Sequence, residues 1–330
     1  MTSHARVVIL PHSAQDSARC VKDPGACCAK GPRTKVPILK RGNGHGLLLD
    51  RLPLLGIWGL EPRDPADDDF TQLIGSVKSE AAAVYDTDAN MRVSLFVTCL
   101  VDQLYPQVGI AAVKLLRGLG LDVVFEQDQT CCGQPALNTG YVDEARKVAA
   151  CFLKTFRRAE LIVTPSGSCA TMVKKFIPEL FEPGSPQHQE AEQIAGRTFE
   201  LSDYLVNQLG VTDVEATFPH TVTFHDSCHQ LRELGIFEQP RTLIRRVRDL
   251  QFVEMENSTR CCGFGGTFGV KFEALSAAIG SDKVAAIEAS GADVVVSNDV
   301  SCLMHIEGLL KRRRIPVRAM HLAELLVQTS

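Results

Sequence analysis

The chain has 330 residues, a formal net charge of −4, 45% hydrophobic residues and 22% charged residues. This length is sufficient for two domains, and the composition is ordinary for a soluble globular protein. The charge argues against nucleic acid as a partner, and without a run of 18 apolar residues no membrane span is predicted. The N-terminus lacks the basic-then-apolar pattern of a signal peptide. Twelve cysteines in such a chain favour metal or redox chemistry in the cytoplasm over a disulfide framework.

Residues 1–90 differ in composition from the rest of the chain. Prolines are frequent there, short glycine clusters occur, and hydrophobic periodicity is weak. These features predict an irregular or disordered extension ahead of Met91. Cys20, Cys27 and Cys28 imitate a cysteine pair, but no later cysteine in the segment completes a site.

Residues 91–330 contain two copies of one cysteine pattern. The first copy consists of Cys99, Cys131-Cys132-Gly133 and Cys169, and the second of Cys228, Cys261-Cys262-Gly263 and Cys302. The lone first cysteine is separated from the pair by 31 residues in one copy and 32 in the other, and the later gaps of 36 and 39 residues are also similar. A repeat of this kind predicts two folded units with one site each.

The sequence around the cysteines predicts alternating strands and helices. Short β-branched runs typical of buried strands occupy residues 93–98, 161–164, 221–227 and 293–297. Amphipathic stretches that predict helices occupy residues 108–119, 142–158 and 272–289. The expected fold is therefore α/β, with two tandem pseudo-symmetric three-layer units, each a small parallel sheet flanked by helices.

We expect a first domain over residues 91–215 and a second over residues 216–330. A polar stretch and a helix-like segment at 201–209 lie just before this boundary. Each cysteine position follows a predicted strand, and the carboxyl ends of parallel strands build the sites of such sheets. The four thiols of each copy should therefore meet at one sheet edge.

Four thiolates are the usual protein complement of an iron–sulfur cluster, and the neighbouring Gly133 and Gly263 allow backbone N–H groups to approach sulfur. Adjacent cysteines suit different metal atoms of one cluster better than a single zinc ion, whose ligands usually come as C-x₂₋₄-C pairs. We expect one cluster, [4Fe–4S] in type, in each copy. Structural zinc and disulfide exchange at Cys131 and Cys132 remain alternatives. The glycines after Cys262 do not match a dinucleotide fingerprint, because Phe268 occupies the last glycine position.

From Met91 onward the chain resembles the lactate-utilization protein A family. This family belongs to the wider CCG cysteine-rich group, which includes the CCG-containing subunit of heterodisulfide reductase and the iron–sulfur subunit of glycolate oxidase. The resemblance rests on Cys99, Cys131-Cys132-Gly133-Gln134-Pro135, Ser166-Gly167-Ser168-Cys169, His225-Asp226-Ser227-Cys228, Cys261-Cys262-Gly263-Phe264-Gly265-Gly266 and Ser301-Cys302.

The resemblance implies that each copy binds an iron–sulfur cluster and passes electrons. It also implies partnership with the other subunits of a complex that oxidises L-lactate to pyruvate, in which this chain is a non-catalytic or co-catalytic subunit. In the heterodisulfide reductase relatives the third element is C-x-x-C, whereas Ser166 and Asp299 stand at the added positions here. Non-cubane, substrate-cleaving chemistry is therefore not expected. A zinc-stabilised scaffold subunit and a thiol/disulfide reductase are the alternative functions.

Four polar residues lie next to the predicted ligands in the second copy, namely His225, Asp226, His229 and His305. A histidine there could replace a thiol or donate a hydrogen bond to cluster sulfur, or it could be an ordinary loop residue, and both interpretations stay open. Cys151 lies within a predicted helix, away from the repeat, and is expected to be a small buried residue. The basic run 311–314 is expected to complement a helix dipole.

Overall fold

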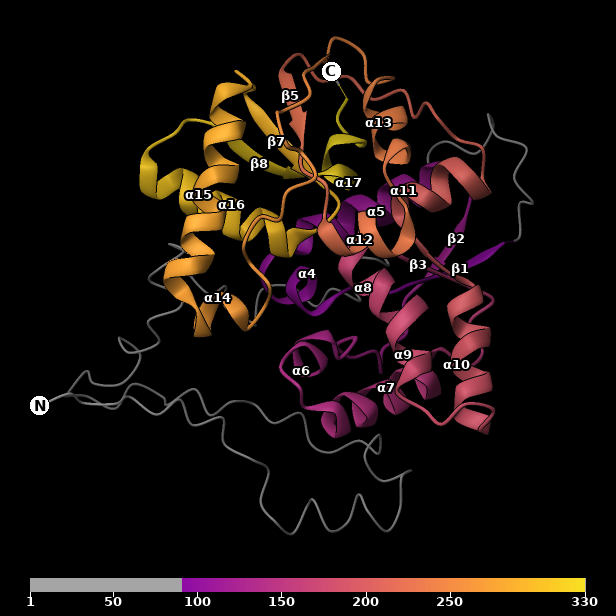
Figure 1. Cartoon of the computed structure of the whole chain (residues 1–330). Coiled ribbons are helices and arrows are strands. Elements are labelled where there is room, and N and C mark those ends of the chain that lie inside the picture. The colour runs from indigo at the N-terminus through magenta and orange to yellow at the C-terminus, as the bar shows by residue number, and fades with distance from the viewer. Residues whose placement is uncertain (1–90, 330) are drawn as a thin grey trace, which may run out of the picture. The chain divides into compact units, whose positions relative to one another are not determined.

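A computed structural model of the protein describes residues 91–329, and the predicted extension 1–90 lies outside this range. The model contains two four-stranded sheets, all of whose strands are parallel (Figure 1). In spatial order the first sheet comprises β2 (Asp122–Val124), β1 (Arg92–Leu95), β3 (Leu161–Thr164) and β4 (Thr198–Glu200). The second comprises β6 (Gln251–Phe252), β5 (Thr221–Phe224), β7 (Val294–Ser297) and β8 (Arg318–His321). The matching strand order confirms the predicted pair of α/β units.

Helices connect the strands in both copies. The first copy has α4 (Cys99–Leu104), α5 (Pro106–Gly118), α6 (Gln134–Asn138), α7 (Val142–Phe156), α8 (Gly167–Thr171), the π-helical turn η2 (Met172–Phe176), α9 (Ile177–Glu179), α10 (Pro186–Gly196), α11 (Leu201–Asp203) and the π-helical turn η3 (Tyr204–Gln208). The second has α12 (Cys228–Leu234), α13 (Glu238–Ile244), α14 (Phe268–Lys271), α15 (Glu273–Ala289), α16 (Val300–Arg313) and α17 (Leu322–Leu325). Helices α5, α7 and α15 match the three amphipathic stretches that the sequence predicts, and α11 with η3 matches the helix-like segment at 201–209. Over residues 91–329, no helix has the length and apolar character needed to cross a membrane.

Side chains of the central strands alternate between two cores. In β7, Val294 and Val296 belong to a core that both copies share, while Val295 belongs to an outer core with residues of α15 and α16. In β3, Val163 belongs to the shared core and Ile162 to an outer core with residues of α7. Both faces of these strands are buried because helices cover both sides of a parallel sheet. The separate domains at 91–215 and 216–330 stay a prediction.

Two helix N-caps bind each other where the copies meet. Ser166 Oγ accepts a hydrogen bond from Cys169 N at 3.3 Å at the start of α8, and Asp299 Oδ1 accepts one from Ser301 N at 3.1 Å at the start of α16. Across the junction, Asp299 Oδ2 accepts from Ser168 N at 2.8 Å and from Ser166 Oγ at 3.3 Å. Ser166 and Asp299 therefore join the two copies.

The helices that begin near the cysteines also pack across the junction. Helix α12, which starts at Cys228, packs against α8, which contains Cys169 (Figure 1). Helix α4, which starts at Cys99, contacts α16, which contains Cys302. Each copy thus places its first cysteine on a helix that touches the helix of the last cysteine in the other copy.

Replacing Asp299 by alanine should lower the free energy of unfolding by about 2–3 kcal/mol, since it removes a buried charged acceptor and leaves the Ser168 N–H without it. Chemical denaturation measures the loss. Asp293→Ala is the matched control, because its carboxylate also accepts a backbone N–H, from Thr221 at 2.9 Å, but is 57% exposed. The control should lose less than about 1 kcal/mol. If the two variants lose the same free energy of unfolding, the hydrogen bonds of Asp299 across the junction contribute no more stability than one exposed hydrogen bond.

Candidate metal centres

The cysteines of each copy lie where the strand order reverses. The chain runs from β1 outward to β2, then returns to β3 on the other side of β1, and the second copy repeats this path. Cys99 and Cys169 begin or lie in the helices that follow β1 and β3, and Cys228 and Cys302 follow β5 and β7 in the same way. The crevice at such a reversal, at the carboxyl ends of the strands, is the usual binding site of an open parallel sheet.

The structure brings the four predicted ligands of the first copy together. Cys99 Sγ lies 3.7 Å from Cys131 Sγ, and Cys132 Sγ lies 3.5 Å from Cys169 Sγ. The backbone N–H of Gly133 donates to Cys131 Sγ at 3.4 Å. Cys132 and Cys169 are buried, whereas Cys99 and Cys131 are half-buried.

The second copy repeats this arrangement with its own four cysteines. The Cys228 thiol hydrogen-bonds to Cys261, and the Cys262 thiol hydrogen-bonds to Cys261 and Cys302. The N–H of Gly263 donates to Cys261 Sγ at 3.3 Å, and the N–H of Phe264 donates to Cys262 Sγ at 3.5 Å. The eight predicted ligands therefore form two sets of four, one in each copy.

One cysteine in each set has an acidic thiol. Hydrogen bonds from Cys132 and Cys99 lower the pKa of Cys131, although burial acts in the opposite direction. Hydrogen bonds involving Cys228 and Cys262 lower the pKa of Cys261 in the same way. The thiolate is the form of cysteine that binds metals, so each set contains one ligand ready to bind, and metal binding would release the protons of the others.

The donor set and its surroundings fit a metal ion or an iron–sulfur cluster. All four donors in each set are sulfur atoms, which suit both zinc and iron–sulfur clusters. Backbone N–H groups directed at sulfur, as at Cys131 and Cys261, favour the negative charge that such a centre carries.

The glycine of each CCG triplet has a backbone conformation that other residues rarely adopt. Gly133 has a φ of +88° and Gly263 a φ of +93°. A Cβ at Gly263 would also lie 2.5 Å from the carbonyl oxygen of Ser276, whereas the nearest atom at Gly133 is Val148 Cγ1, at 3.4 Å. Glycine is thus required by φ in both copies and by close backbone approach in the second.

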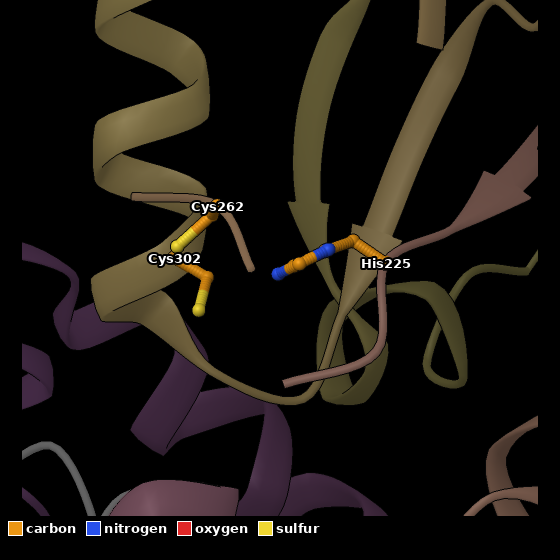
Figure 2. Close-up of side chains that lie close together, drawn as sticks. All are labelled: His225, Cys262 and Cys302. Carbon is orange, nitrogen blue, oxygen red and sulfur yellow. The ribbon is translucent and has the colours of Figure 1, made fainter. Parts of the chain in front are cut away.

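His225 belongs to the second site. Its side chain extends from the end of β5 toward Cys262 and Cys302, and the ligand atoms of the three residues lie within 4.8 Å of one another (Figure 2). The residue is completely buried, and neither ring nitrogen has a hydrogen-bond partner among the described residues. Burial, together with the charge of Lys283, lowers the pKa of His225 to about 3, so the imidazole is neutral. His225 thus lies in the loop after β5 and faces the thiols, and its role as a ligand or hydrogen-bond donor stays a prediction.

The other two histidines have different surroundings. His229 Nδ1 lies 3.9 Å from Cys228 Sγ, and its ring meets that of Phe176 edge-on at 6.3 Å. His305 is buried one turn after the last cysteine, with Nε2 3.5 Å from Ser276 Oγ on α15.

Asp226 is paired with an arginine, and Cys151 lies on α7. Both carboxylate oxygens of Asp226 accept hydrogen bonds from Arg241 at 2.8 Å, in an ion pair whose side chains are 1% exposed. Cys151 is half-buried on α7 and not fully buried as expected, because the apolar face of that helix is formed by neighbours such as Ala149 and Phe152.

Lys283 is a residue near the second site that the sequence analysis missed. It is 2% exposed on α15, and its Nζ donates to Asn257 O at 2.8 Å and Ser258 O at 2.9 Å. Its charge interacts with Cys262 and Cys302. The available signal was its place on the helix, since Lys283 follows the buried Gly280 by three residues and precedes a buried valine.

Gly263→Ala should damage the protein more than Gly133→Ala. Both variants place an alanine at positive φ, which costs about 1–2 kcal/mol, but only the Gly263 variant also pushes a Cβ into a backbone carbonyl. We expect Gly263→Ala to lower both the melting temperature and the metal content of the second site, while Gly133→Ala retains more of each. Thermal unfolding and metal analysis measure the two effects, and a larger loss in Gly133→Ala would contradict the geometry.

Comparison with known proteins gives three findings. The family model of the CCG cysteine-rich domain matches the chain twice, over residues 93–174 and 222–307. Lactate utilization protein A of Bacillus subtilis (strain 168) is 46% identical over 236 residues, which cover 72% of this chain and 99% of that protein. Lactate utilization protein A of Geobacillus thermodenitrificans (strain NG80-2) is 45% identical, with 72% and 98% covered.

The solved structure of a hypothetical protein from Helicobacter pylori has a similar fold, with a TM-score of 0.53 and 11% identity, over 79% of this chain. The match covers 54% of that protein, so the chain spans about half its length. The assignment of the chain to a family rests on the sequence matches, which include both cysteine repeats and nearly the whole length of the relatives. The chain belongs to the lactate utilization protein A family of CCG cysteine-rich domain proteins.

Proposed function

We propose that the protein is an iron–sulfur electron-transfer subunit of a multi-protein system that oxidises L-lactate to pyruvate. The observation that carries this proposal is the presence of two four-thiol sets, one in each copy, in a chain 46% identical to a lactate utilization protein A. Oxidation of lactate to pyruvate releases two electrons, and two one-electron centres match that number.

Each part of the thiol set has a role in this proposal. A bound iron–sulfur cluster supplies one-electron transfer, and four thiolates in each copy would hold one cluster, [4Fe–4S] in type. The buried Cys132 and Cys262 keep water away from one side of each site. The half-buried Cys99 and Cys131 leave the other side near the surface, where a partner subunit could exchange electrons.

The positions of Ser166 and Asp299 support a relay over a disulfide-cleaving reductase. In the five-thiol relatives an added cysteine stands at this place in the motif. Here the two side chains cap α8 and α16 and bind each other across the junction. Each set therefore has four thiols, a complement that favours an ordinary cluster.

The remaining proposals concern partners and compartment. The partners are the other subunits of the lactate-oxidising system, and the net charge of −4 argues against nucleic acid. The compartment is the cytoplasm, because eight cysteines that act as thiolate ligands need an environment where thiols stay reduced. A zinc-stabilised scaffold subunit is the second candidate, which the all-sulfur donor sets also suit.

Protein purified without oxygen should contain iron and acid-labile sulfide. Cys132→Ser and Cys262→Ser should each lower the iron content by about half, because each removes a ligand from one of two separate sets. Cys151→Ser, outside both sets, is the control and should leave the iron content unchanged. Zinc without sulfide would support the scaffold. Loss of all iron in one single variant would indicate a centre shared by the two copies.

The protein alone should accept electrons from a strong reductant but should not oxidise lactate with an artificial acceptor. Lactate oxidation should appear when the partner subunits are added. It should fall severely in Cys262→Ser, while size-exclusion chromatography shows that the complex still assembles. Lactate turnover by the chain alone would refute the relay, and full activity of the variant would favour the scaffold.

A further inference from the structure

The two copies place different residues at equivalent positions around the thiols. Phe96 stands three residues before Cys99, and His225 stands three residues before Cys228. The atoms that face the CCG glycines come from Ala145 and Val148 on α7 in the first copy, and from Ser276 and Ile279 on α15 in the second. This correspondence aligns the two helices and pairs Phe152 with Lys283.

Three phenylalanines, Phe96, Phe152 and Phe156, form what we call the aromatic wall of the first set of thiols. Phe96 packs edge-on against Phe152 and Phe156, with ring centroids 5.0 and 5.6 Å apart. All three rings are completely buried, and they share one hydrophobic core with Cys132 and Cys169. No charge or N–H donor comes from these three side chains.

In the second set, Lys283 and His225 take the positions of Phe152 and Phe96 and form what we call the polar wall. Lys283 replaces Phe152 and directs its ammonium group to two backbone carbonyl oxygens. Burial lowers the pKa of Lys283 to about 8, against the raising effect of Cys262, Asp226 and Cys302, so the group stays cationic at neutral pH. His225 replaces Phe96 with a buried imidazole whose nitrogens have no partner among residues 91–329.

The ligand type and the exposure of the buried thiols are closely matched between the copies. Each set has four thiols, and the buried members have similar exposure, 2% for Cys132 and Cys262, 8% for Cys169 and 6% for Cys302. Each set also receives a backbone N–H from its CCG glycine, and the second set receives one more, from Phe264 N to Cys262 Sγ at 3.5 Å, which acts in the same direction as a positive charge. Ligand type, charge, hydrogen bonding and exposure set the potential of a cluster, and the wall is the main difference in charge between the two sets.

We propose that the second set of thiols holds the centre of higher reduction potential, because Lys283 and His225 line it where the first set is lined by phenylalanines. The inference rests on the proposed iron–sulfur function. Reduction adds one negative charge to a centre, and a nearby ammonium group stabilises that charge. The imidazole N–H of His225 can in addition donate to the sulfur of a bound centre.

The packing between the copies allows the difference in potential to direct an electron. The helices that carry Cys169 and Cys228 pack against each other, and so do those that carry Cys99 and Cys302. When a chemical reductant supplies one electron per chain, that electron should therefore move to the second centre. The first centre should be reduced only by the next electron.

The test is a redox titration of the full-length protein, loaded with iron and sulfide without oxygen and followed by electron spin resonance. Cys132→Ser and Cys262→Ser assign the signals, since each should remove one of them. The signal that is lost in Cys262→Ser should be the first to appear as the potential is lowered. Equal midpoint potentials, or the reverse order, would overturn the inference and leave the proposed function intact. Protein that binds no iron would overturn both.

Variants of the wall test its cause. Lys283→Met and His225→Phe should each shift the midpoint potential of the second centre to a more negative value and leave that of the first unchanged. Lys283→Arg, which keeps the charge, should shift it less. Lys174→Met is the matched control, because Lys174 is half-buried in the first copy and also donates to two carbonyl oxygens, those of Ala195 and Thr198.

Lys174→Met should leave the midpoint potentials of both centres unchanged. If Lys283→Met and His225→Phe retain two centres with unchanged midpoint potentials, the wall does not set the difference and the inference fails. The order of reduction in the unmodified protein tests the proposal even where a variant does not fold.

Discussion

The reversal of strand order in each sheet is the constraint on which both sites depend. A parallel strand needs a crossover connection to its neighbour, and the chain uses these crossovers first on one side of the central strand and then on the other. The two connections separate at the carboxyl ends of β1 and β3, where ligands usually bind in open parallel sheets. Cys99 and Cys169 approach this place from two sides because each lies near the start of a helix that begins there. The position of the thiols is thus a consequence of topology.

The junction between the copies determines how the two crevices relate. A shared core contains residues of both sheets, and the N-cap Asp299 of one copy accepts hydrogen bonds from the start of α8 in the other. A buried carboxylate with several donors fixes geometry closely, since moving any partner leaves a charged or polar group without a hydrogen bond. The two sites are therefore held in one framework, while the outer cores on the far sides of the sheets vary independently. Phe96 and Phe152 lie in one such outer core.

The sequence predicts the fold and the grouping of the eight cysteines well, because both depend on repeated local patterns. The β-branched runs at β3 and β7 and the spacing of the eight cysteines can be read directly from the chain. What the sequence could not predict depends on packing. The helical spacing places Lys283 on the buried face of α15, but it could not predict the two carbonyl oxygens that accept hydrogen bonds from the ammonium group there. The sequence shows Ser166 and Asp299 only as positions without a cysteine, and it could not predict that they bind each other, because the two residues lie in different copies.

The first copy shows that the fold itself does not need a polar wall. Phe152 fills the position of Lys283 with hydrocarbon, and Phe96 fills that of His225, in a unit with the same strand order. A buried ammonium group costs free energy, which two carbonyl oxygens and nearby thiols offset only in part. A buried imidazole without hydrogen-bond partners among the described residues adds a further cost. A core that retains both groups, where two phenylalanines fit in the other copy, is less stable than it could be. That cost is explained if the groups act on what the thiols hold.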